Sequence, residues 1–238
     1  MPPAAPAELP RTGVVVVAAG SGTRVGAPTN KVLLPLLGEP VLAWSLHTIA
    51  SLPYVDHLVV VAREQDTEAV TAVVEAALAG PQEVREAVLV TGGPTRHESE
   101  WRGLRPLRPA VEAGTLEVIA VHDAARPLAD AALFEATVRA AHEHGGALPV
   151  RSRPALVGAD GARHGGLVGV QTPQAFRAAP LLEAYARAEA DGFAGTDTAS
   201  CVARYTDLEI AGVPAPATNL KITFPEDVAI AERLLGMR

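Results

Sequence analysis

The first stretch of the chain with the means for chemistry is a glycine-rich loop that carries two cations. It follows a run of four valines at positions 14–17, which is continuously apolar and therefore typical of a strand buried on both faces. The loop contains three glycines and two cations: Gly20, Gly22, Gly26, Arg24 and Lys31. Glycine lets the backbone approach a ligand closely and point N–H groups at phosphate oxygens, and the cations offset the phosphate charge. The stretch therefore predicts a cradle for a polyphosphate.

Two commoner phosphate-binding loops do not fit this spacing. A P-loop needs G-x-x-x-x-G-K-[ST], which is absent, and the dinucleotide fingerprint needs G-x-G-x-x-G, whereas Gly26 comes one residue too late. No acidic residue follows at the distance that a ribose would need. What remains, A-A-G-x-G-x-R followed by P-x-N-K, is similar to the signature loop of sugar-type nucleotidyltransferases. The alternative is a tight turn with surface cations, which leaves this concentration of glycines and cations unexplained.

A second motif, residues 121–127 (VHDAARP), places an acidic side chain just beyond an apolar strand. Asp123 at that position can hold Mg²⁺, which favours one or two carboxylates completed by phosphate oxygens and water. A helix cap or a turn is the alternative role for Asp123. We expect His122 to pack or hydrogen-bond rather than bind a metal, and Arg126 to fix the loop through backbone carbonyls.

Three further motifs are weaker when taken singly. Residues 92–99 (GGPTRHES) form another glycine turn after a strand, and the Ser99 hydroxyl together with the backbone could read a base edge. In the segment TDTAS, Asp197 is either a helix N-cap or a catalytic group. In the segment NLKIT, Lys221 lies in an apolar, strand-like context, where an ammonium group requires an anionic partner.

The composition narrows the class of protein. The chain has 238 residues, a net charge of −7 and 4% aromatic residues, which argues against the basic surface and the stacking platforms of nucleic-acid binding. No apolar run approaches the roughly 20 residues that span a bilayer. The single cysteine, Cys201, is expected to be a buried small residue rather than a nucleophile. We therefore expect a cytoplasmic protein that binds neither nucleic acid nor membrane and starts with a loose tail, residues 1–11.

Strand-like runs alternate with helical patterns along the chain. The expected strands are 14–18, 57–62, 87–90, 116–121, 147–150, 167–170 and 208–213. The expected helices are 41–51, 64–78, 97–104, 130–144, 180–190, 198–205 and 226–235. Such alternation favours βαβ units and a mostly parallel sheet, with ligands bound at the carboxyl ends of the strands. The loops after Ala18, Val90 and Val121 are therefore the expected places for a site.

One segment, residues 151–166 (RSRPALVGADGARHGG), interrupts this alternation. It holds a proline, four glycines and an Asp-Gly turn signal, but no amphipathic helix. Because strand-like runs flank it, residues 147–170 are expected to form a protruding β-arm. A mobile surface loop is one interpretation, and an arm that packs on a second subunit is the other.

The ordered set AAGSGTR, PTNK, GGPTRHES, HDAARP, QTPQ, TDTAS and NLKIT resembles the 2-C-methyl-D-erythritol 4-phosphate cytidylyltransferase family of non-mevalonate isoprenoid synthesis. The resemblance covers nearly the whole chain from about Gly13, and ribitol-5-phosphate cytidylyltransferases share most of the scheme. It implies a Rossmann-like three-layer α/β nucleotidyltransferase fold with a mostly parallel sheet and a protruding β-arm. Residues 12–238 would be a single domain, with 147–170 as an inserted arm for dimerisation and acceptor binding and 1–11 as a flexible tail.

The family condenses CTP with a sugar-alcohol phosphate in the presence of Mg²⁺ or another divalent cation, and it releases pyrophosphate. By resemblance, the catalytic residues that stabilise charge as the acceptor phosphate attacks are Arg24, Lys31 and Lys221, and the metal ligand is Asp123. The nucleotide-binding residues are Ala18, Ala19, Gly20, Ser21, Gly22, Thr23, Gly93, Ser99 and Ala124. The acceptor-binding residues are Arg153, His164, Thr172 and Thr196, and the arm crosses to the other subunit of a homodimer.

The arm is also where the chain departs from the family pattern. The family has Asp-Thr, an apolar residue and Lys where this chain has residues 152–155 (SRPA), and its later phosphate-binding arginine falls on His164. Neutral histidine is a weaker phosphate ligand than arginine unless the phosphate raises its pKa. Either Arg153, Arg163 or His164 replaces the missing groups, or the acceptor is different, for example ribitol 5-phosphate. A third alternative, an inactive nucleotide-binding relative, is opposed by four retained residues: Arg24, Lys31, Asp123 and Lys221.

Overall fold

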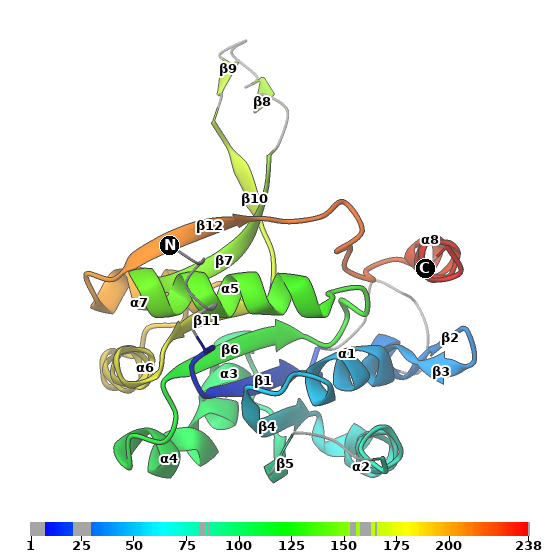
Figure 1. The fold of residues 1–238 in the computed structure, drawn as a ribbon, viewed down its shortest axis with the longest axis horizontal. Helices are drawn as coiled ribbons and strands as arrows, with labels where there is room; N and C mark the ends of the chain where they lie inside the picture. Colours follow the sequence, from blue (N-terminus) through cyan, green and yellow to red (C-terminus); the bar gives the residue numbers. More distant parts are fainter. Residues whose placement is uncertain are drawn as a thin grey trace, which may run out of the picture.

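The structure, a computed structural model, describes residues 8–20, 30–80, 84, 86–152, 156–157, 163–164 and 166–237. Its centre is an eight-stranded sheet in the order β10-β7-β11-β6-β1-β4-β5, with β12 paired to β7 (Figure 1). The strands of this sheet are β1 (Thr12–Val17), β4 (Val55–Ala62), β5 (Glu86–Thr91), β6 (Val118–Asp123), β7 (Gly145–Ser152), β10 (Val168–Val170), β11 (Gln174–Arg177) and β12 (Glu209–Pro214).

The sheet is mostly parallel, as the alternation of strands and helices predicts. β1 pairs in parallel with β4 and β6, β4 pairs in parallel with β5, and β12 with β7. Only the pairs that involve β10 and β11 are antiparallel among these strands. The carboxyl ends of β1, β4, β5 and β6 therefore meet at one edge, where ligands bind in sheets of this kind.

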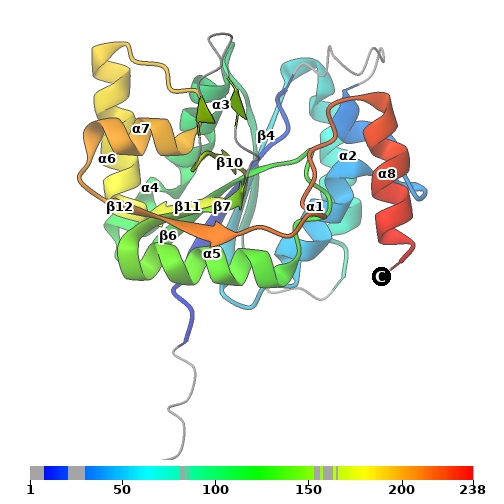
Figure 2. The ribbon, with the colours of Figure 1, turned by 90° about the horizontal axis from the view of Figure 1, so that it is seen from above.

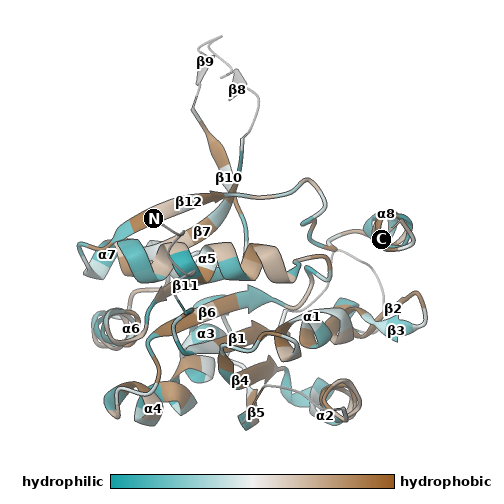
Figure 3. Cartoon of the chain, in the orientation of Figure 1, coloured by the Kyte–Doolittle hydropathy of each residue, from teal (hydrophilic) through white to brown (hydrophobic). Residues whose placement is uncertain are grey.

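Helices cover both faces of the sheet (Figure 2). They are α1 (Val41–Ala50), α2 (Thr67–Ala77), α3 (Arg96–Leu104), α4 (Arg108–Glu112), α5 (Ala131–His144), α6 (Ala178–Asp191), α7 (Thr198–Tyr205) and α8 (Pro225–Leu235). Because successive side chains of a strand point to opposite faces, Val14 and Val16 pack with α1, α2 and α5, whereas Val15 packs with α3, α6 and α7. Figure 3 shows the apolar character of β1 and β4 that this two-sided burial requires.

Side-chain caps fix where α3 and α7 begin. Thr95 accepts a hydrogen bond from the Glu98 backbone N–H, and the Glu98 carboxylate accepts one from the Thr95 N–H, which closes a capping box before α3. Asp197 and Ser200 make the same arrangement before α7. Asp197 is therefore a helix N-cap, the structural one of the two roles that the sequence left open.

Among the described elements, β11, α4 and the antiparallel pair of short strands β2 (Pro35–Leu36) and β3 (Glu39–Pro40) were not expected from the sequence. β11 is four residues long and inserts antiparallel between β6 and β7, and such a short run shows no period of its own. α4 follows the short 3₁₀ turn η4 (Arg105–Leu107), in a segment whose prolines hide the helical pattern. The expected helix 64–78 begins as the 3₁₀ turn η3 (Glu64–Asp66) and becomes α-helical at Thr67.

The expected arm is present in outline. β7 and β10 form an antiparallel ladder, and the two-residue strands β8 (Leu156–Val157) and β9 (Arg163–His164) pair beyond it, at the tip of the protrusion in Figure 1. The Asp-Gly turn signal at 160–161 lies outside the described residues. Of the helices that are described, none combines the length and apolar character needed to cross a membrane.

Candidate active site

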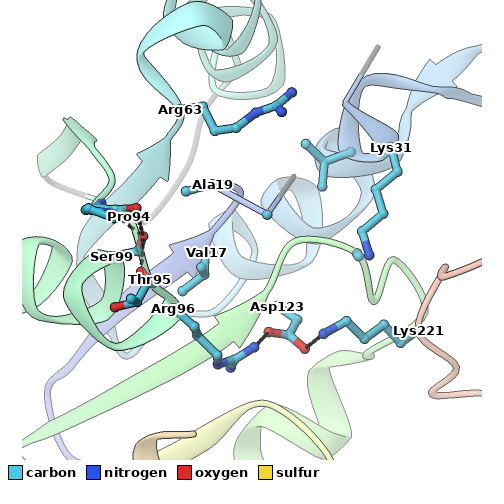
Figure 4. A pocket seen from close by; sticks show the side chains of 14 residues that line it. Val17, Ala19, Lys31, Arg63, Pro94, Thr95, Arg96, Ser99, Asp123 and Lys221 are labelled. Atoms are coloured by element: carbon cyan, nitrogen blue, oxygen red, sulfur yellow. Dashed lines mark hydrogen bonds and ion pairs between the residues drawn. The ribbon is translucent and has the colours of Figure 1, made fainter. Parts of the chain in front are cut away.

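A pocket of about 480 Å³ opens at the carboxyl ends of β1, β4, β5 and β6. It lies where the loops after Ala18, Val90 and Val121 were expected to meet. Its lining residues come from these strand ends and the loops after them, the 3₁₀ turn η2 (Lys31–Leu33), the first half of α3 and the segment before α8: Val17, Ala19, Gly20, Lys31, Val32, Arg63, Gly93, Pro94, Thr95, Arg96, Ser99, Asp123, Ala125 and Lys221. Figure 4 shows Arg96, Asp123 and Lys221 in a row, with Lys31 directed toward the same space and Arg63 on the opposite side.

Seven of the residues singled out from the sequence line this pocket: Ala19, Gly20, Lys31, Gly93, Ser99, Asp123 and Lys221. Four others, Ser21, Gly22, Thr23 and Arg24, lie outside the described residues, as does Arg153 of the arm. His164 is described only as part of the backbone of β9. Within the part of the chain that the structure describes, these seven predicted residues therefore gather in one place.

Asp123, at the end of β6, is the electrostatic centre of the pocket. Its carboxylate accepts hydrogen bonds from Arg96 Nη1 at 2.6 Å and from Lys221 Nζ at 2.7 Å, and Arg126 Nε lies 3.7 Å away. Burial alone would raise the pKa of Asp123, but the three neighbouring cations outweigh burial and hold the pKa well below its ordinary value. Asp123 therefore stays ionised at ordinary pH and is surrounded by cationic side chains.

The segment that carries Lys221 is docked onto the loop after β6 by buried hydrogen bonds. Arg126 Nη1 donates to the Asn219 carbonyl at 3.0 Å, and the Ile222 N–H donates to the Ala125 carbonyl at 2.8 Å. The first bond confirms the prediction that Arg126 fixes the loop through a backbone carbonyl. The segment is irregular rather than a strand, so the strand-like interpretation of NLKIT was wrong. The anionic partner expected for Lys221 is Asp123.

Lys31 is held at the pocket by the residue before it. Asn30 caps the 3₁₀ turn η2 (Lys31–Leu33), and its Nδ2 donates to the Ala18 carbonyl at 3.0 Å and to Asp66 Oδ2 at 2.8 Å. The same oxygen of Asp66 accepts from Arg63 Nε at 2.6 Å. Asp66 therefore joins the end of β4 to the end of the first loop. Because Asn30 is held in place, the backbone position of the next residue, Lys31, is fixed as well.

Close backbone packing brings the loop after β5 to the pocket. A Cβ at Gly92 would lie 2.6 Å from the Ala19 Cβ, so only glycine permits this approach. Ser99 Oγ accepts a hydrogen bond from the Gly93 N–H at 3.0 Å and contacts the Thr95 carbonyl at 2.9 Å. The Ser99 hydroxyl thus closes its own loop, and Gly93, Pro94 and Thr95 of this loop line the pocket.

Four remaining predicted residues lie behind or outside the lining. Ala18 and Ala124 are fully buried and bond through their backbone N–H groups to Val61 and Val17. Thr172 Oγ1 accepts from the Asp123 N–H at 3.0 Å, so it fixes the position of Asp123. Thr196 is exposed and is not among the lining residues.

His122 does not line the pocket, in agreement with the expectation that it packs or hydrogen-bonds. It is fully buried against the Phe134 ring, with ring centroids 5.0 Å apart, and its Nδ1 lies 3.3 Å from Thr172 Oγ1. Burial lowers the pKa of His122 to about 4, so the ring is neutral at ordinary pH. These contacts are those of a packed, hydrogen-bonded side chain.

The sequence did not single out Arg63, Arg96 and Glu100. Arg96 lies within the motif GGPTRHES, and its spacing to Glu100 is that of neighbours on a helix, the one signal that could have found the pair. In the structure Arg96 Nε donates to Glu100 Oε1 at 2.8 Å. The partner of an arginine on another element depends on how the elements pack. The spacing of residues in the sequence does not show this packing.

The donor set suits a divalent cation only when a nucleotide accompanies it. Within the described ranges, no group of three or more His, Cys, Asp or Glu side chains could hold a metal ion. One carboxylate, Asp123, faces the pocket, and its two oxygens are occupied by Arg96 and Lys221. Mg²⁺ accepts such a sparse protein contribution when phosphate oxygens and water complete its shell. A cation here would share the Asp123 oxygens with Arg96 and Lys221, or would displace one of these two side chains.

A mostly parallel sheet with cations around one carboxylate at its carboxyl edge is the arrangement of an α/β nucleotidyltransferase. Residues 12–237 match the family described as IspD: 2-C-methyl-D-erythritol 4-phosphate cytidylyltransferase. The curated enzyme of that name from Symbiobacterium thermophilum is 40% identical and covers 93% of this chain and 92% of its own length. The chain belongs to the 2-C-methyl-D-erythritol 4-phosphate cytidylyltransferase family.

Other relatives agree with this membership. A bifunctional IspD/IspF enzyme from Clavibacter michiganensis is 40% identical over 95% of this chain, which matches 55% of that longer protein. The crystal structure of the 2-C-methyl-D-erythritol 4-phosphate cytidylyltransferase from Thermus thermophilus superimposes with a TM-score of 0.69 at 29% identity, over 93% of this chain and 98% of the other. The 4-diphosphocytidyl-2C-methyl-D-erythritol synthase from Anaerococcus prevotii, at 24% identity, shares the fold with a TM-score of 0.78 over 94% and 98% of the two chains.

Proposed function

We propose that this chain transfers CMP from CTP to the phosphate of 2-C-methyl-D-erythritol 4-phosphate and releases pyrophosphate. The observation that carries the proposal is the pocket itself, in which four cations, Lys31, Arg63, Arg96 and Lys221, and the carboxylate of Asp123 line a common space. A triphosphate and a phosphate monoester bring several negative charges together, and a site that joins them needs such an excess of positive charge. The names of the family and of the curated relatives support the choice of substrates.

In this reaction an oxygen of the acceptor phosphate attacks the α-phosphorus of CTP, and the bond from that phosphorus to the bridging oxygen of pyrophosphate breaks. No covalent intermediate with the protein is needed, so the protein positions the reactants and stabilises charge. Lys31 and Arg24 would stabilise the charge on the α-phosphate oxygens, and Lys221 would lie beside the incoming phosphate. Their fixed placement means that little reorganisation is required when charge develops.

The nucleotide would lie between the first loop and the loop after β5. Backbone N–H and C=O groups of Ala19, Gly20 and Gly93 border this part of the pocket, and Ser99 holds Gly93 in place. Ser21, Gly22 and Thr23 of the first loop would complete the nucleotide contacts, and Ala18 and Ala124 would support these loops from behind the lining. Backbone groups in fixed orientation can distinguish cytosine from other bases by the hydrogen bonds that its edge offers.

We further propose Mg²⁺ as the cofactor, held by Asp123 together with phosphate oxygens. When bound, the ion would neutralise phosphate charge and polarise the α-phosphate. Thr172 would support it indirectly, because its hydroxyl fixes the Asp123 backbone. Arg126, anchored on the Asn219 carbonyl, would keep a positive charge next to this carboxylate.

The proposal extends to the domain organisation, the oligomeric state and the cellular compartment of the protein. We propose one domain, residues 12–238, that forms a homodimer through the arm, and we propose that it works in the cytoplasm. Val168 and Val170 of β10 are half exposed, which suits an arm whose apolar side chains are covered by a second subunit. Arg153, His164 and Thr196 would then contribute to the acceptor side.

The test is pyrophosphate release from each of the four ribonucleoside triphosphates, combined with 2-C-methyl-D-erythritol 4-phosphate, ribitol 5-phosphate or no acceptor. We expect turnover with CTP and the first acceptor only, and a strong loss of kcat in Lys31→Ala, with Arg139→Ala on the exposed face of α5 as the control. Turnover of ribitol 5-phosphate instead would contradict the acceptor assignment. Arg153→Ala should mainly raise the acceptor KM, and a silent variant would remove Arg153 from the site.

A further inference from the structure

A second carboxylate lies buried directly behind the wall of the pocket. Glu100 is fully buried on α3, one turn after Arg96, and accepts a hydrogen bond from Arg96 Nε at 2.8 Å. The other side of the same guanidinium donates to Asp123 Oδ1 at 2.6 Å through Nη1. Arg96 is therefore shared between two carboxylates, one that faces the pocket and one that does not.

Glu100 is itself locked in place from behind. Its other oxygen accepts a hydrogen bond from the Tyr185 hydroxyl of α6. Tyr185 is fully buried and stacks on His97 of α3, with ring centroids 4.6 Å apart. A carboxylate with both oxygens bonded and no exposed surface has no freedom to follow Arg96 into the pocket.

Arg96 is less constrained than its partners. Its side chain keeps 28% of its surface exposed, and it lines the pocket, whereas the Glu100 side chain is fully covered. The planar guanidinium carries donors on several edges and can keep one carboxylate while it changes the partner on another edge. The Asp123 edge of Arg96 is the one that faces the space proposed for the phosphates.

We propose that Glu100, braced by Tyr185, is a positioning residue that retains Arg96 on the pocket wall while Arg96 exchanges Asp123 for a nucleotide phosphate, which frees Asp123 for a divalent cation. This inference rests on the proposed nucleotide and metal chemistry of the same pocket. It addresses the competition for Asp123, because Arg96 and Lys221 each bond to one of the oxygens that a divalent cation would bind. With only one carboxylate partner, Arg96 would hold Asp123 more tightly and compete with the cation for it.

The charges of the cluster predict opposite effects with and without metal. Three cations (Arg96, Arg126, Lys221) surround two carboxylates (Asp123, Glu100). In Glu100→Gln the net positive charge of this cluster rises, so metal-free CTP should bind as well as in the wild type or more tightly. The divalent cation should bind less well, because Arg96 then has Asp123 as its one carboxylate partner. A merely structural defect would weaken both kinds of binding.

The experiment is calorimetric titration of the full-length protein with CTP, once in EDTA and once in excess Mg²⁺, in the absence of acceptor. The quantity to compare is the ratio of the metal-free Kd to the Kd with Mg²⁺. In Glu100→Gln we expect this ratio to fall by about three- to tenfold, since charge-assisted hydrogen bonds to buried guanidinium groups are of that order. An equal loss of affinity in both conditions, or no change in either, would overturn the proposal.

Two further variants separate charge from packing. Tyr185→Phe removes the hydroxyl that braces Glu100 but keeps both charges, so the ratio should fall in the same direction as in Glu100→Gln and by a smaller factor; a rise of the ratio in Tyr185→Phe would overturn the proposal. Glu135→Gln removes an exposed glutamate–arginine pair with the same i,i+4 spacing on α5, away from the pocket, and is the control for the loss of a glutamate charge. Should Glu100→Gln fail to fold, Arg96→Lys tests the exchange from the other side, because an ammonium lacks the fork that spans two carboxylates; an unchanged ratio there would equally refute it.

The same titrations also distinguish a failure of this inference from a failure of the proposed function. Wild-type protein that binds CTP and releases pyrophosphate, combined with an unchanged ratio in Glu100→Gln, leaves the function standing and removes the exchange. If the wild type prefers another nucleoside triphosphate, the same titrations are made with that nucleotide. A fall in the ratio then supports the exchange although the assignment of CTP has failed.

Discussion

Asp123 and Lys221 form an ion pair with 2.7 Å between Oδ2 and Nζ, although 98 positions separate them along the chain. The pair exists because the segment before α8 is bonded to the loop after β6 through Arg126 and Ala125. Asp123 keeps Arg96 and Arg126 as partners in addition to Lys221. Lys221 therefore contributes positive charge to the pocket. If Lys221 is removed, the buried Asp123 carboxylate still has two cationic partners.

Lys221→Ala should separate catalysis from stability. Removing one charged group that stabilises developing charge lowers kcat by about 100- to 1000-fold in enzymes that depend on such groups. Because Arg96 and Arg126 continue to neutralise Asp123 and Lys221 is partly exposed, the free energy of unfolding should change by no more than about 1 kcal/mol. Pyrophosphate release and urea unfolding measure the two effects. Unchanged kcat would remove Lys221 from the catalytic groups.

The sequence predicted the parts of the pocket that follow from strand ends. β1, β4, β5 and β6 are apolar runs with polar loops behind them, and the parallel arrangement brings those loops together. The contacts between these loops were not predictable, because they depend on packing across the sheet. Arg96 and Asp123 are 27 positions apart, and nothing in their spacing shows that they touch.

The hydrogen-bond partners of two hydroxyl groups were also not predictable from the sequence. Ser99 and Thr172 were expected to meet substrates, yet the Ser99 hydroxyl bonds to Gly93 and the Thr172 hydroxyl to the Asp123 N–H. A motif shows that a hydroxyl is near a site but not which of several neighbouring backbone groups it satisfies. Short elements such as β11 escape prediction for a related reason, since burial of Ala175 and Phe176 between two strands defines it.

Asp66→Asn should act on two cations of the pocket, on Lys31 through Asn30 and on Arg63 directly. Asp66 accepts hydrogen bonds from Asn30 and Arg63, and an asparagine at this position keeps the shape but loses the charge that pairs with Arg63. We expect kcat to fall by about three- to tenfold, because small displacements of a positioning group are costly in a reaction that relies on orientation. The control is Glu64→Gln, an exposed residue on the same 3₁₀ turn. Equal activity of both variants would show that the Asp66 bonds do not position Lys31.

Gly92→Ala should push the loop after β5 away from the first loop. The new methyl group would lie 2.6 Å from the Ala19 Cβ and 3.0 Å from Ser99 Oγ, which forces a backbone shift at the proposed nucleotide site. Overpacking of this kind typically costs about 1–3 kcal/mol of stability, and the KM for CTP should rise as well. Gly80→Ala is the matched control, because a Cβ at Gly80 meets no atom within 4 Å. A normal KM and normal stability in Gly92→Ala would contradict the close approach of these loops.

Cys201 should be inert in the folded protein. It is fully buried on α7, and burial, together with the negative charge of Glu100, raises the pKa of its thiol to about 12. Since the thiolate is the reactive form, Cys201 should resist iodoacetamide between pH 7 and 9, and it should be alkylated fully once the chain is unfolded in urea. Mass spectrometry of the intact protein counts the adducts, with the unfolded sample as the positive control. Cys201→Ala should retain kcat, because the proposed transfer forms no bond to the protein; rapid alkylation of the native chain, accompanied by loss of activity, would show that Cys201 belongs to the site after all.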